Sequence, residues 1–298
     1  MNKYKQRNES SIINIRVFHN WVKRQLINDA KKYLRDNYNI NEISLLDLAV
    51  GKGGDIGKWY DAGIYTVIGF DIDETSINGK NGAIDRYNEF VSKLKPGKKI
   101  PNYKFYVMDL SDPDSISKIQ HIIPGQKFNI ISCQFAIHYF FKNELSLNTL
   151  VSIINNHSYQ NNTKTIFIST TMNGEYLSEI FKKNIEIKNS LFRIIKSKEI
   201  TMKNNSPYGN KYTVSLGKES DIGHYFVEKP SEEYMVNLEE LKKVCEKKNL
   251  IFIGKTNFDR WYEMYLETKT LSDKYKLTNE EKEFSFLNYS FIFMSIKS

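Results

Sequence analysis

The chain has 298 residues, of which 40% are hydrophobic and 26% charged, and this balance excludes an intrinsically disordered protein. Its formal net charge of +8 favours a polyanionic partner such as nucleic acid, although a lysine-rich solvated surface would give the same surplus. Cys133 and Cys245 form no C-x-x-C pair, which indicates a reducing compartment and argues against a metal site of the structural zinc type. No apolar run reaches the ~18 residues of a membrane span, and no apolar signal segment opens the chain, so we expect a cytoplasmic protein with no membrane partner.

The predicted elements begin with an amphipathic helix over residues 12–36, where Ile15, Phe18, Val22 and Leu26 recur at helical spacing. Strands and helices then alternate. We expect strands at 43–50, 65–73, 103–110, 128–135 and 164–170, and helices at 55–61, 75–94, from 113 and near 143–156. Near-continuous apolar runs separated by helices predict a parallel sheet covered on both faces, and right-handed crossovers make this a doubly wound, Rossmann-like α/β domain.

The pattern changes after the fifth strand. Residues of about 172–232 are rich in Lys, Asn and Tyr and show no clear alternation, so we expect a lid-like insertion that carries a small extra sheet. A helix at 237–250 and strands at 251–256 and 289–296 complete a mostly parallel, seven-stranded sheet. With no internal repeat and no long linker, we expect one domain over residues 1–298.

The first strand is followed by a glycine-rich turn within LLDLAVGKGGDIGKW, residues 45–59. Gly51 and its neighbours allow a tight turn and a close approach of the backbone to a ligand. The spacing is not G-x-G-x-x-G, and Asp47 and Asp55 flank the turn, where carboxylates would repel phosphate. A ligand with a positive centre fits better, although a purely structural turn remains the alternative.

Carboxylates also end the next two predicted strands. Asp71 lies 20 residues after Gly51 and can accept hydrogen bonds from both hydroxyls of an adenosine ribose. Asp109 ends the third strand at the same edge, where it can meet the adenine amino group. Each aspartate alone could be a helix N-cap, but together with Asp47 they indicate S-adenosylmethionine (SAM) as the cofactor.

The fourth strand runs into SCQFAIHYFF, residues 132–141, where Gln134, His138 and Tyr139 place polar groups at the point where a buried element should close. A histidine here could also be a hydrogen-bonded core residue. Four segments now resemble one family. They are NIRVFHNWVK (14–23), DLAVGKGGDIGKW (47–59), NGAIDRY (81–87) and SCQFAIHYFF (132–141). The chain resembles mRNA cap (guanine-N7) methyltransferases, and most of all the methyltransferase domains of capping enzymes from large cytoplasmic DNA viruses.

The resemblance implies a class I SAM-dependent methyltransferase fold and transfer of a methyl group to N7 of the guanosine cap. The residues that it assigns to SAM are Lys23, Ala49, Asp71, Asp109, Gln134 and Tyr139, joined by Gly51 from the turn. Its candidates for the capped end are Asn20, Lys52, Lys58, Arg86, His138, Glu233 and Tyr289. Lys52, Lys58 and Arg86 suit the triphosphate bridge, because cations neutralise its charge.

Within this set Glu233 can accept hydrogen bonds from N1–H and the amino group of guanine, while Tyr289 can line or stack on the base. Because N7 already carries a lone pair, no proton must be removed, and His138, Tyr139 and Glu233 act only by positioning. The implied partner is the capped 5′ end of mRNA, beside other capping-enzyme domains or an activating subunit, and not DNA. The implied location is the cytoplasm, which for a viral protein means that of the host, or the virion.

The sequence departs from the family pattern at His19, where a second asparagine is usual, and at Ala49 and Val50, which replace a glycine and a cysteine. Two other functions stay open. A 2′-O-ribose RNA methyltransferase would need a Lys-Asp-Lys-Glu set, yet the fourth strand offers Gln134. A non-catalytic RNA-binding or regulatory module with the same fold would not need an intact Gly51, Asp71 and Asp109.

Overall fold

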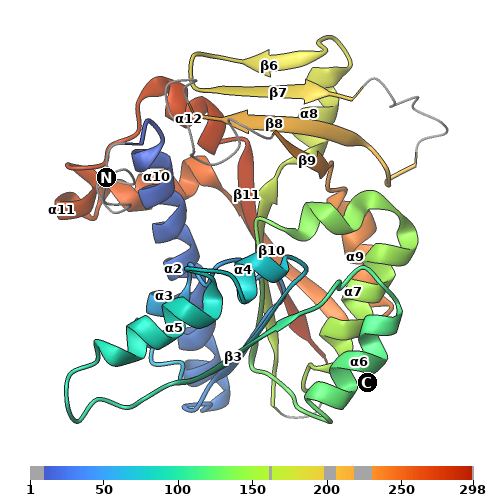
Figure 1. Cartoon of the computed structure of the whole chain (residues 1–298). Helices are drawn as coiled ribbons and strands as arrows, with labels where there is room; N and C mark the ends of the chain where they lie inside the picture. Colours follow the sequence, from blue (N-terminus) through green and yellow to red (C-terminus); the bar gives the residue numbers. More distant parts are fainter. Residues whose placement is uncertain (1–9, 161–162, 198–205, 218–229, 297–298) are drawn as a thin grey trace.

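The computed structural model describes residues 10–160, 163–197, 206–217 and 230–296, and contains two β-sheets, one above the other (Figure 1). The larger sheet has seven strands in the order β10-β11-β5-β4-β1-β2-β3. Its strands are β1 (Ser44–Asp47), β2 (Thr66–Asp71), β3 (Asn102–Val107), β4 (Ile130–Gln134), β5 (Ile166–Met172), β10 (Leu250–Asn257) and β11 (Asn288–Ser295). β11 runs antiparallel to its neighbours β10 and β5, and all strand pairs among β1 to β5 are parallel. The predicted doubly wound α/β sheet is therefore confirmed.

Helices cover both faces of this sheet, which is why β4 and β5 are buried along their whole length. One face packs against α2 (Ile13–Tyr38), α3 (Ile56–Asp61), α5 (Ala83–Ser92) and α10 (Phe258–Leu266). The other packs against α6 (Asp114–Ile122), α7 (Glu144–Asn156) and α9 (Leu238–Glu246). The remaining short helices are α4 (Glu74–Ile77), α11 (Lys269–Ser272), α12 (Asn279–Ser285) and the 3₁₀-helix η1 (Ile137–Lys142).

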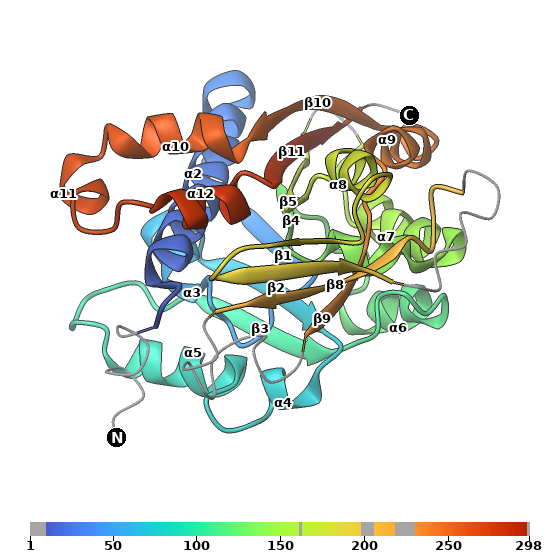
Figure 2. The same cartoon turned by 90° about the horizontal axis from the view of Figure 1, so that it is seen from above.

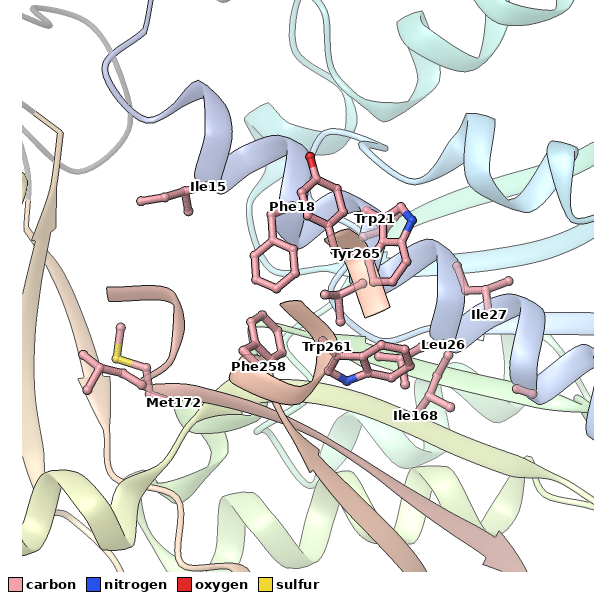
Figure 3. Packing of buried hydrophobic residues seen from close by; sticks show 14 of the residues in the cluster. Ile15, Phe18, Trp21, Leu26, Ile27, Ile168, Met172, Phe258, Trp261 and Tyr265 are labelled. Carbon is pink, nitrogen blue, oxygen red and sulfur yellow. The ribbon is translucent and has the colours of Figure 1, made fainter. Parts of the chain in front are cut away.

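The first helix is held by an aromatic cluster (Figure 3). Phe18 and Trp21 of α2 face α10, with ring centroids 5.8 Å from Phe258 and 6.1 Å from Trp261. Burial of an aromatic side chain stabilises a fold by roughly 1.5–3 kcal/mol. The cluster therefore fixes α2 beside the sheet, and with it the polar face that α2 turns toward the functional site. α10, α11 and α12 are absent from the sequence predictions.

One predicted helix is wrong in its extent. Residues 75–94 were expected to form a single helix, but they form α4 and α5 with a break between them. Asn81 adopts a left-handed backbone there, with φ of 61°, which no α-helix continues through. The break turns the NGAIDRY segment so that α5 begins at Ala83 and Arg86 lies in its first turn.

The insertion leaves the main domain after β5 and forms the second sheet, as expected. It consists of α8 (Gly174–Phe181) and the antiparallel strands β6 (Glu186–Lys188), β7 (Phe192–Lys196), β8 (Lys211–Leu216) and β9 (Ser231–Tyr234). Parts of the predicted insertion lie outside the described residues. Along β8, Tyr212, Val214 and Leu216 are buried and alternate with half-buried residues, so one face of this sheet looks down on the larger one (Figure 2).

Both ends of the insertion meet at one point. A Cβ atom on Gly174 would lie 2.2 Å from the carbonyl oxygen of Val236, so only glycine fits there. The Leu238 amide donates to the carboxylate of Glu175 at 2.7 Å. The first turn of α8 and the segment after β9 therefore form a closed stem.

Candidate functional site

A cavity of about 550 Å³ lies between α2, the carboxyl ends of β1 and β4, and the inner face of the insertion sheet. Most of the predicted site residues line it: Asn20, Lys23, Ala49, Gly51, Lys52, Lys58, Arg86, Gln134, His138, Tyr139 and Glu233. Three do not, namely Asp71, Asp109 and Tyr289. The cavity thus brings together residues from α2, the glycine-rich turn, α5, η1 and β9, which are far apart in the sequence.

The glycine-rich turn is tied to the neighbouring strand. Gly51 has a φ of 51°, a left-handed conformation that glycine adopts without strain, and its amide donates to Asp71 Oδ2 at 2.7 Å. Asp71 is half-buried, and its other oxygen accepts from the Asp73 amide at 3.0 Å. Asp109 is exposed on the same edge and accepts from the amide of Ser111 at 2.9 Å. Neither carboxylate caps a helix, and each keeps acceptor positions for a ligand.

Lys23, Asp55 and Lys58 form a buried ion cluster at one end of the cavity. Lys23 Nζ lies 2.7 Å and 2.9 Å from the two oxygens of Asp55, and Lys58 Nζ lies 2.7 Å from Asp55 Oδ1. Burial favours the neutral form of Asp55, but the two ammonium groups outweigh it and hold the pKa of this carboxyl well below its usual range. Asp55 therefore carries its charge and orients both lysines.

This cluster bears on the role expected for Lys58, which lines the cavity as the prediction requires. The side chain was assigned to the triphosphate bridge, but it is only 7% exposed and also donates to the Gly54 carbonyl at 3.1 Å. Two of its three donors are thus directed at Asp55 and Gly54, as two contacts of Lys23 are directed at Asp55. Lys52 is exposed, and Arg86 is half-buried with its Nε donating to the Asn81 carbonyl at 3.0 Å.

Asp47 lies beneath the turn and is nearly inaccessible to solvent. One of its oxygens accepts from the Ala49 amide at 3.1 Å. Burial and then the negative charge of Asp55 raise the pKa of Asp47 to about 7. The carboxyl end of β1 therefore holds a carboxyl group that is easily protonated.

The chain turns sharply after β4 and so presents the His-Tyr pair. Gln134 accepts from Thr170 Oγ1 at 2.9 Å and donates to Ser132 Oγ at 3.2 Å, which fixes its amide. Phe135 has a φ of 54°, uncommon for a residue other than glycine, and its amide donates to the Thr170 carbonyl at 3.0 Å. The 3₁₀-helix η1 then begins at Ile137 and carries His138 into the cavity.

Glu233 and Glu232 on β9 face opposite ways. Glu233 is 7% exposed and lines the cavity, whereas the Glu232 side chain is 62% exposed and pairs with Lys211. Glu233 Oε2 accepts from the hydroxyl of Tyr212 at 2.8 Å, and Oε1 lies 3.8 Å from His138 Nε2. Burial lowers the pKa of His138, although Glu233 opposes this, and the imidazole is neutral near pH 7. The carboxylate of Glu233 therefore lies next to an uncharged His138 imidazole.

His19 has aromatic neighbours on both sides. Its ring stacks on Phe135 with a centroid distance of 5.2 Å and on Phe284 at 6.3 Å, and its Nε2 lies 3.1 Å from Ser285 Oγ. Burial and then Lys23 lower the pKa of His19 to about 3, so the ring is uncharged. An uncharged, stacked ring therefore stands where the sequence resemblance led us to expect an asparagine.

Tyr289 is a second correction. It was expected to line or stack on a bound base, but it is fully buried in the hydrophobic core on the α7 and α9 face of the sheet. Its hydroxyl has no hydrogen-bond partner among the described residues, and the neighbouring Asn288 lines the cavity instead. Because side chains alternate along a strand, a shift by one residue exchanges the two faces.

Several lining residues were missed by the sequence analysis. Arg16 lies one turn before Asn20 on α2 and belongs to the quoted NIRVFHNWVK segment, so the motif itself contained the signal. Asp55 was noted only as flanking the turn, although its i, i+3 spacing to Lys58 indicates a pair. Groups of three His, Cys, Asp or Glu side chains suited to a metal ion do not occur in the described part of the chain. No helix among those same residues is long and apolar enough to cross a membrane.

Comparison with known proteins places the chain in a family. The family model of the mRNA (guanine-N(7))-methyltransferase domain matches residues 1–287. A Caenorhabditis elegans mRNA cap guanine-N(7) methyltransferase is 41% identical over 140 residues, which cover 47% of this chain and 34% of that protein. A probable mRNA-capping enzyme of Acanthamoeba polyphaga mimivirus is 27% identical over 307 residues, covering 93% of this chain and 25% of that protein.

The chain thus spans about a quarter to a third of the length of these relatives. A solved S-adenosylmethionine-dependent methyltransferase from Clostridium acetobutylicum is similar in fold, with a TM-score of 0.53, 13% identity and coverage of 91% of both chains. The described fold is therefore that of the class I SAM-dependent methyltransferases. With nearly its whole length matched, the chain belongs to the mRNA (guanine-N(7))-methyltransferase domain family.

Proposed function

We propose that this chain transfers the methyl group of SAM to N7 of the guanosine cap of mRNA, giving the N7-methylated cap and S-adenosylhomocysteine. One observation carries the proposal. Glu233, a buried carboxylate suited to the guanine edge, lines the same cavity as Gly51 and Gln134, which belong to the predicted cofactor side. Family membership supports the same reaction.

The donor set fits SAM chemically. Asp71 and Asp109 offer free acceptor positions to the ribose hydroxyls and the adenine amino group, and Lys23 offers an ammonium to the carboxylate of the methionine moiety. Asp55, which stays charged, keeps a compensating negative charge beside Lys23. SAM supplies an electrophilic methyl group that a neutral nitrogen can attack.

Cations and amides line the other side of the cavity. We assign Lys52, Arg86 and Asn20 to the triphosphate bridge and its riboses, and we add Arg16, which lies on the same face of α2 as Asn20. We reassign Lys58 to positioning, because its side chain is more deeply buried than that of Lys23 and donates to both Asp55 and Gly54. Tyr289 loses its assigned contact with the base.

Little chemistry is required of the side chains. Guanine N7 carries a lone pair, so no residue must act as a base, and alignment of the reactants can supply about 7–11 kcal/mol of barrier reduction. As the purine gains positive charge, the carboxylate of Glu233 favours the product electrostatically. His138 is neutral, and the hydroxyl of Tyr139 donates to or accepts from Ser231 Oγ at 3.2 Å. Because the reaction needs no proton transfer, we assign both side chains to positioning the base.

The test is a methyl-transfer assay with radiolabelled SAM on GpppA-capped RNA, using this chain alone. We expect the wild type to be active and Glu233→Gln to lose most of its kcat/KM while keeping its SAM affinity, because the amide turns a donor toward N1–H. Glu232→Gln is the matched control and should behave as wild type. Inactivity of the wild type with intact SAM binding would contradict the proposal or expose a need for an activating subunit, which adding a candidate partner would reveal.

The same experiment separates the alternatives. A non-catalytic module would give no product and no SAM-dependent rise in melting temperature. A 2′-O-ribose methyltransferase would place the label on ribose rather than on the base, as nuclease digestion of the product would show. A cytoplasmic site of action remains a proposal, supported by two buried cysteines that form no disulfide.

A further inference from the structure

Tyr212 touches the proposed guanine-reading carboxylate without lining the cavity itself. It lies on β8 directly opposite Glu233 of β9 in the register of the two strands. Its hydroxyl donates to Glu233 Oε2 at 2.8 Å, and the residue is only 1% exposed. The bond is therefore between two buried side chains on neighbouring, hydrogen-bonded strands.

The direction of this bond is fixed. A carboxylate can only accept, so Tyr212 must donate. Burial and then the negative charge of Glu233 raise the pKa of Tyr212 well above its ordinary value, so the hydroxyl keeps its proton. The second oxygen of Glu233 lies 3.8 Å from His138 Nε2, which has no hydrogen-bond partner among the described residues. Tyr212 is consequently the side-chain donor that holds the carboxylate within the described part of the chain.

A carboxylate has about four acceptor positions, two on each oxygen. Guanine needs two of them, one for N1–H and one for the 2-amino group. With one position on Oε2 occupied by Tyr212, the carboxylate cannot turn freely about its last bond, and its remaining positions stay directed at the cavity. A carboxylate held in this way needs no reorganisation when guanine binds.

We propose that Tyr212 is a positioning residue that fixes the carboxylate of Glu233 for the guanine edge and thereby sets the discrimination for guanine over bases that lack the 2-amino group. The inference rests on the proposed function. It also explains why a large tyrosine is buried beside an acidic side chain in the insertion sheet, where a phenylalanine would fill the same volume.

The experiment compares methyl transfer to GpppA-capped and IpppA-capped RNA. Tyr212→Phe removes one oxygen and keeps the ring, and Tyr212 does not line the cavity, so SAM affinity in calorimetry should stay close to wild type. We expect kcat/KM for the guanosine cap to fall roughly 10- to 100-fold, the size of a lost hydrogen bond to a charged group. The preference for guanosine over inosine should fall several-fold, because a mobile carboxylate reads the 2-amino group less well.

Tyr208→Phe is the matched control. Tyr208 also donates its hydroxyl to a glutamate, Glu240, at 2.9 Å, but neither residue lines the cavity. This variant should keep both the rate and the preference. If Tyr212→Phe does not fold, Tyr212→Met removes the same hydroxyl with an adaptable side chain, and the same changes are expected.

A double-mutant cycle adds a readout that a structural role would not move. In the Glu233→Gln background, Tyr212→Phe should cause no further loss, because the glutamine is then free to turn its oxygen toward N1–H. Independent, multiplying losses would overturn the inference. So would an active wild type whose Tyr212→Phe variant keeps the wild-type preference for guanosine. A wild type that transfers no methyl group to the guanosine cap, with or without an added candidate subunit, would overturn the proposed function and this inference together.

Discussion

The two sheets of this protein build their parts of the cavity in different ways. On the seven-stranded sheet, Gly51, Asp71, Asp109 and Gln134 lie at the carboxyl ends of parallel strands or in the turns that follow, so each is placed by its own strand and turn. On the four-stranded insertion sheet, the position of Glu233 on β9 depends on the alternation of side chains along that strand and on its hydrogen bond to Tyr212 of the neighbouring strand β8. The first arrangement is local in sequence and the second depends on pairing. Substitutions should therefore divide into those that affect SAM and those that affect the cap.

The largest effect is expected for Asp71→Ala. Loss of two charged hydrogen bonds to the ribose, at about 1.5–3 kcal/mol each, should weaken SAM binding by more than ~100-fold. Affinity for a cap analogue should change little, because the insertion sheet is untouched. Titration calorimetry measures both. Asp73→Ala is the control, since Asp73 caps α4 and should affect stability but not SAM binding. Unchanged SAM affinity in Asp71→Ala would contradict the assignment of SAM to this edge of the sheet.

Asp47→Asn tests whether the edge of the larger sheet dominates the pH dependence of stability. The pKa of Asp47 is raised from 3.8 to about 7, so its protonated form stabilises the fold fully below about pH 4, and this contribution is lost as the pH rises through 7. The variant cannot ionise and should be more stable than wild type at pH 8, by up to about 4 kcal/mol, and similar at pH 4.5. Denaturant unfolding of the ligand-free protein at both pH values gives the answer. An equal difference at the two values would contradict the expectation.

Lys58→Ala tests whether Lys58 supports the cofactor side of the cavity or contacts the triphosphate. Because Lys58 is buried against Asp55, we expect a loss of about 3 kcal/mol of folding stability, at the lower end for a broken buried ion pair since Lys23 still faces Asp55. SAM affinity should fall with it, while the salt dependence of RNA binding stays constant. A weaker salt dependence of RNA binding together with unchanged folding stability would instead indicate that Lys58 contacts the triphosphate.

Lys52→Ala should have the smallest effect on the protein and a selective one on the substrate. Lys52 is exposed, so stability should change by no more than about 0.5 kcal/mol. The KM for capped RNA should rise, and the slope of its logarithm against the logarithm of salt concentration should fall by about one unit. Steady-state kinetics at several salt concentrations measure both quantities. A constant slope would mean that the triphosphate does not pass this turn.

The same division explains what the sequence could predict. The positions of Gly51, Asp71 and Gln134 at the sheet edge could be predicted, because short apolar strands followed by a turn place a residue there whatever the rest of the chain does. Placing Tyr289 required the face of β11, and an alternating pattern without an exposed side leaves that face undecided. Asn288, one residue away, lines the cavity.

Tertiary partners were the other limit. Lys58 carries the charge expected for a phosphate ligand, but the sequence pattern did not show that it would be buried against Asp55 on the preceding turn. Tyr212 gave no signal, because its meaning depends on pairing with a strand that begins at Ser231. The chain after Asn257 lacked predicted helices, although α10 supplies the aromatic side chains that hold α2 in place.

The closed stem at Gly174 and Val236 makes the insertion a unit that leaves and rejoins the main domain at one point. Since the chain departs and returns at one point, lengthening the excursion changes only a loop-closure entropy, about 0.6 kcal/mol for each doubling of its length. A chimaera that exchanges the residues between Asn173 and Asn237 for the corresponding segment of a relative should keep its SAM affinity and take its base preference from the donor. Such a joint would let recognition diversify while the methyl-transfer chemistry stays fixed.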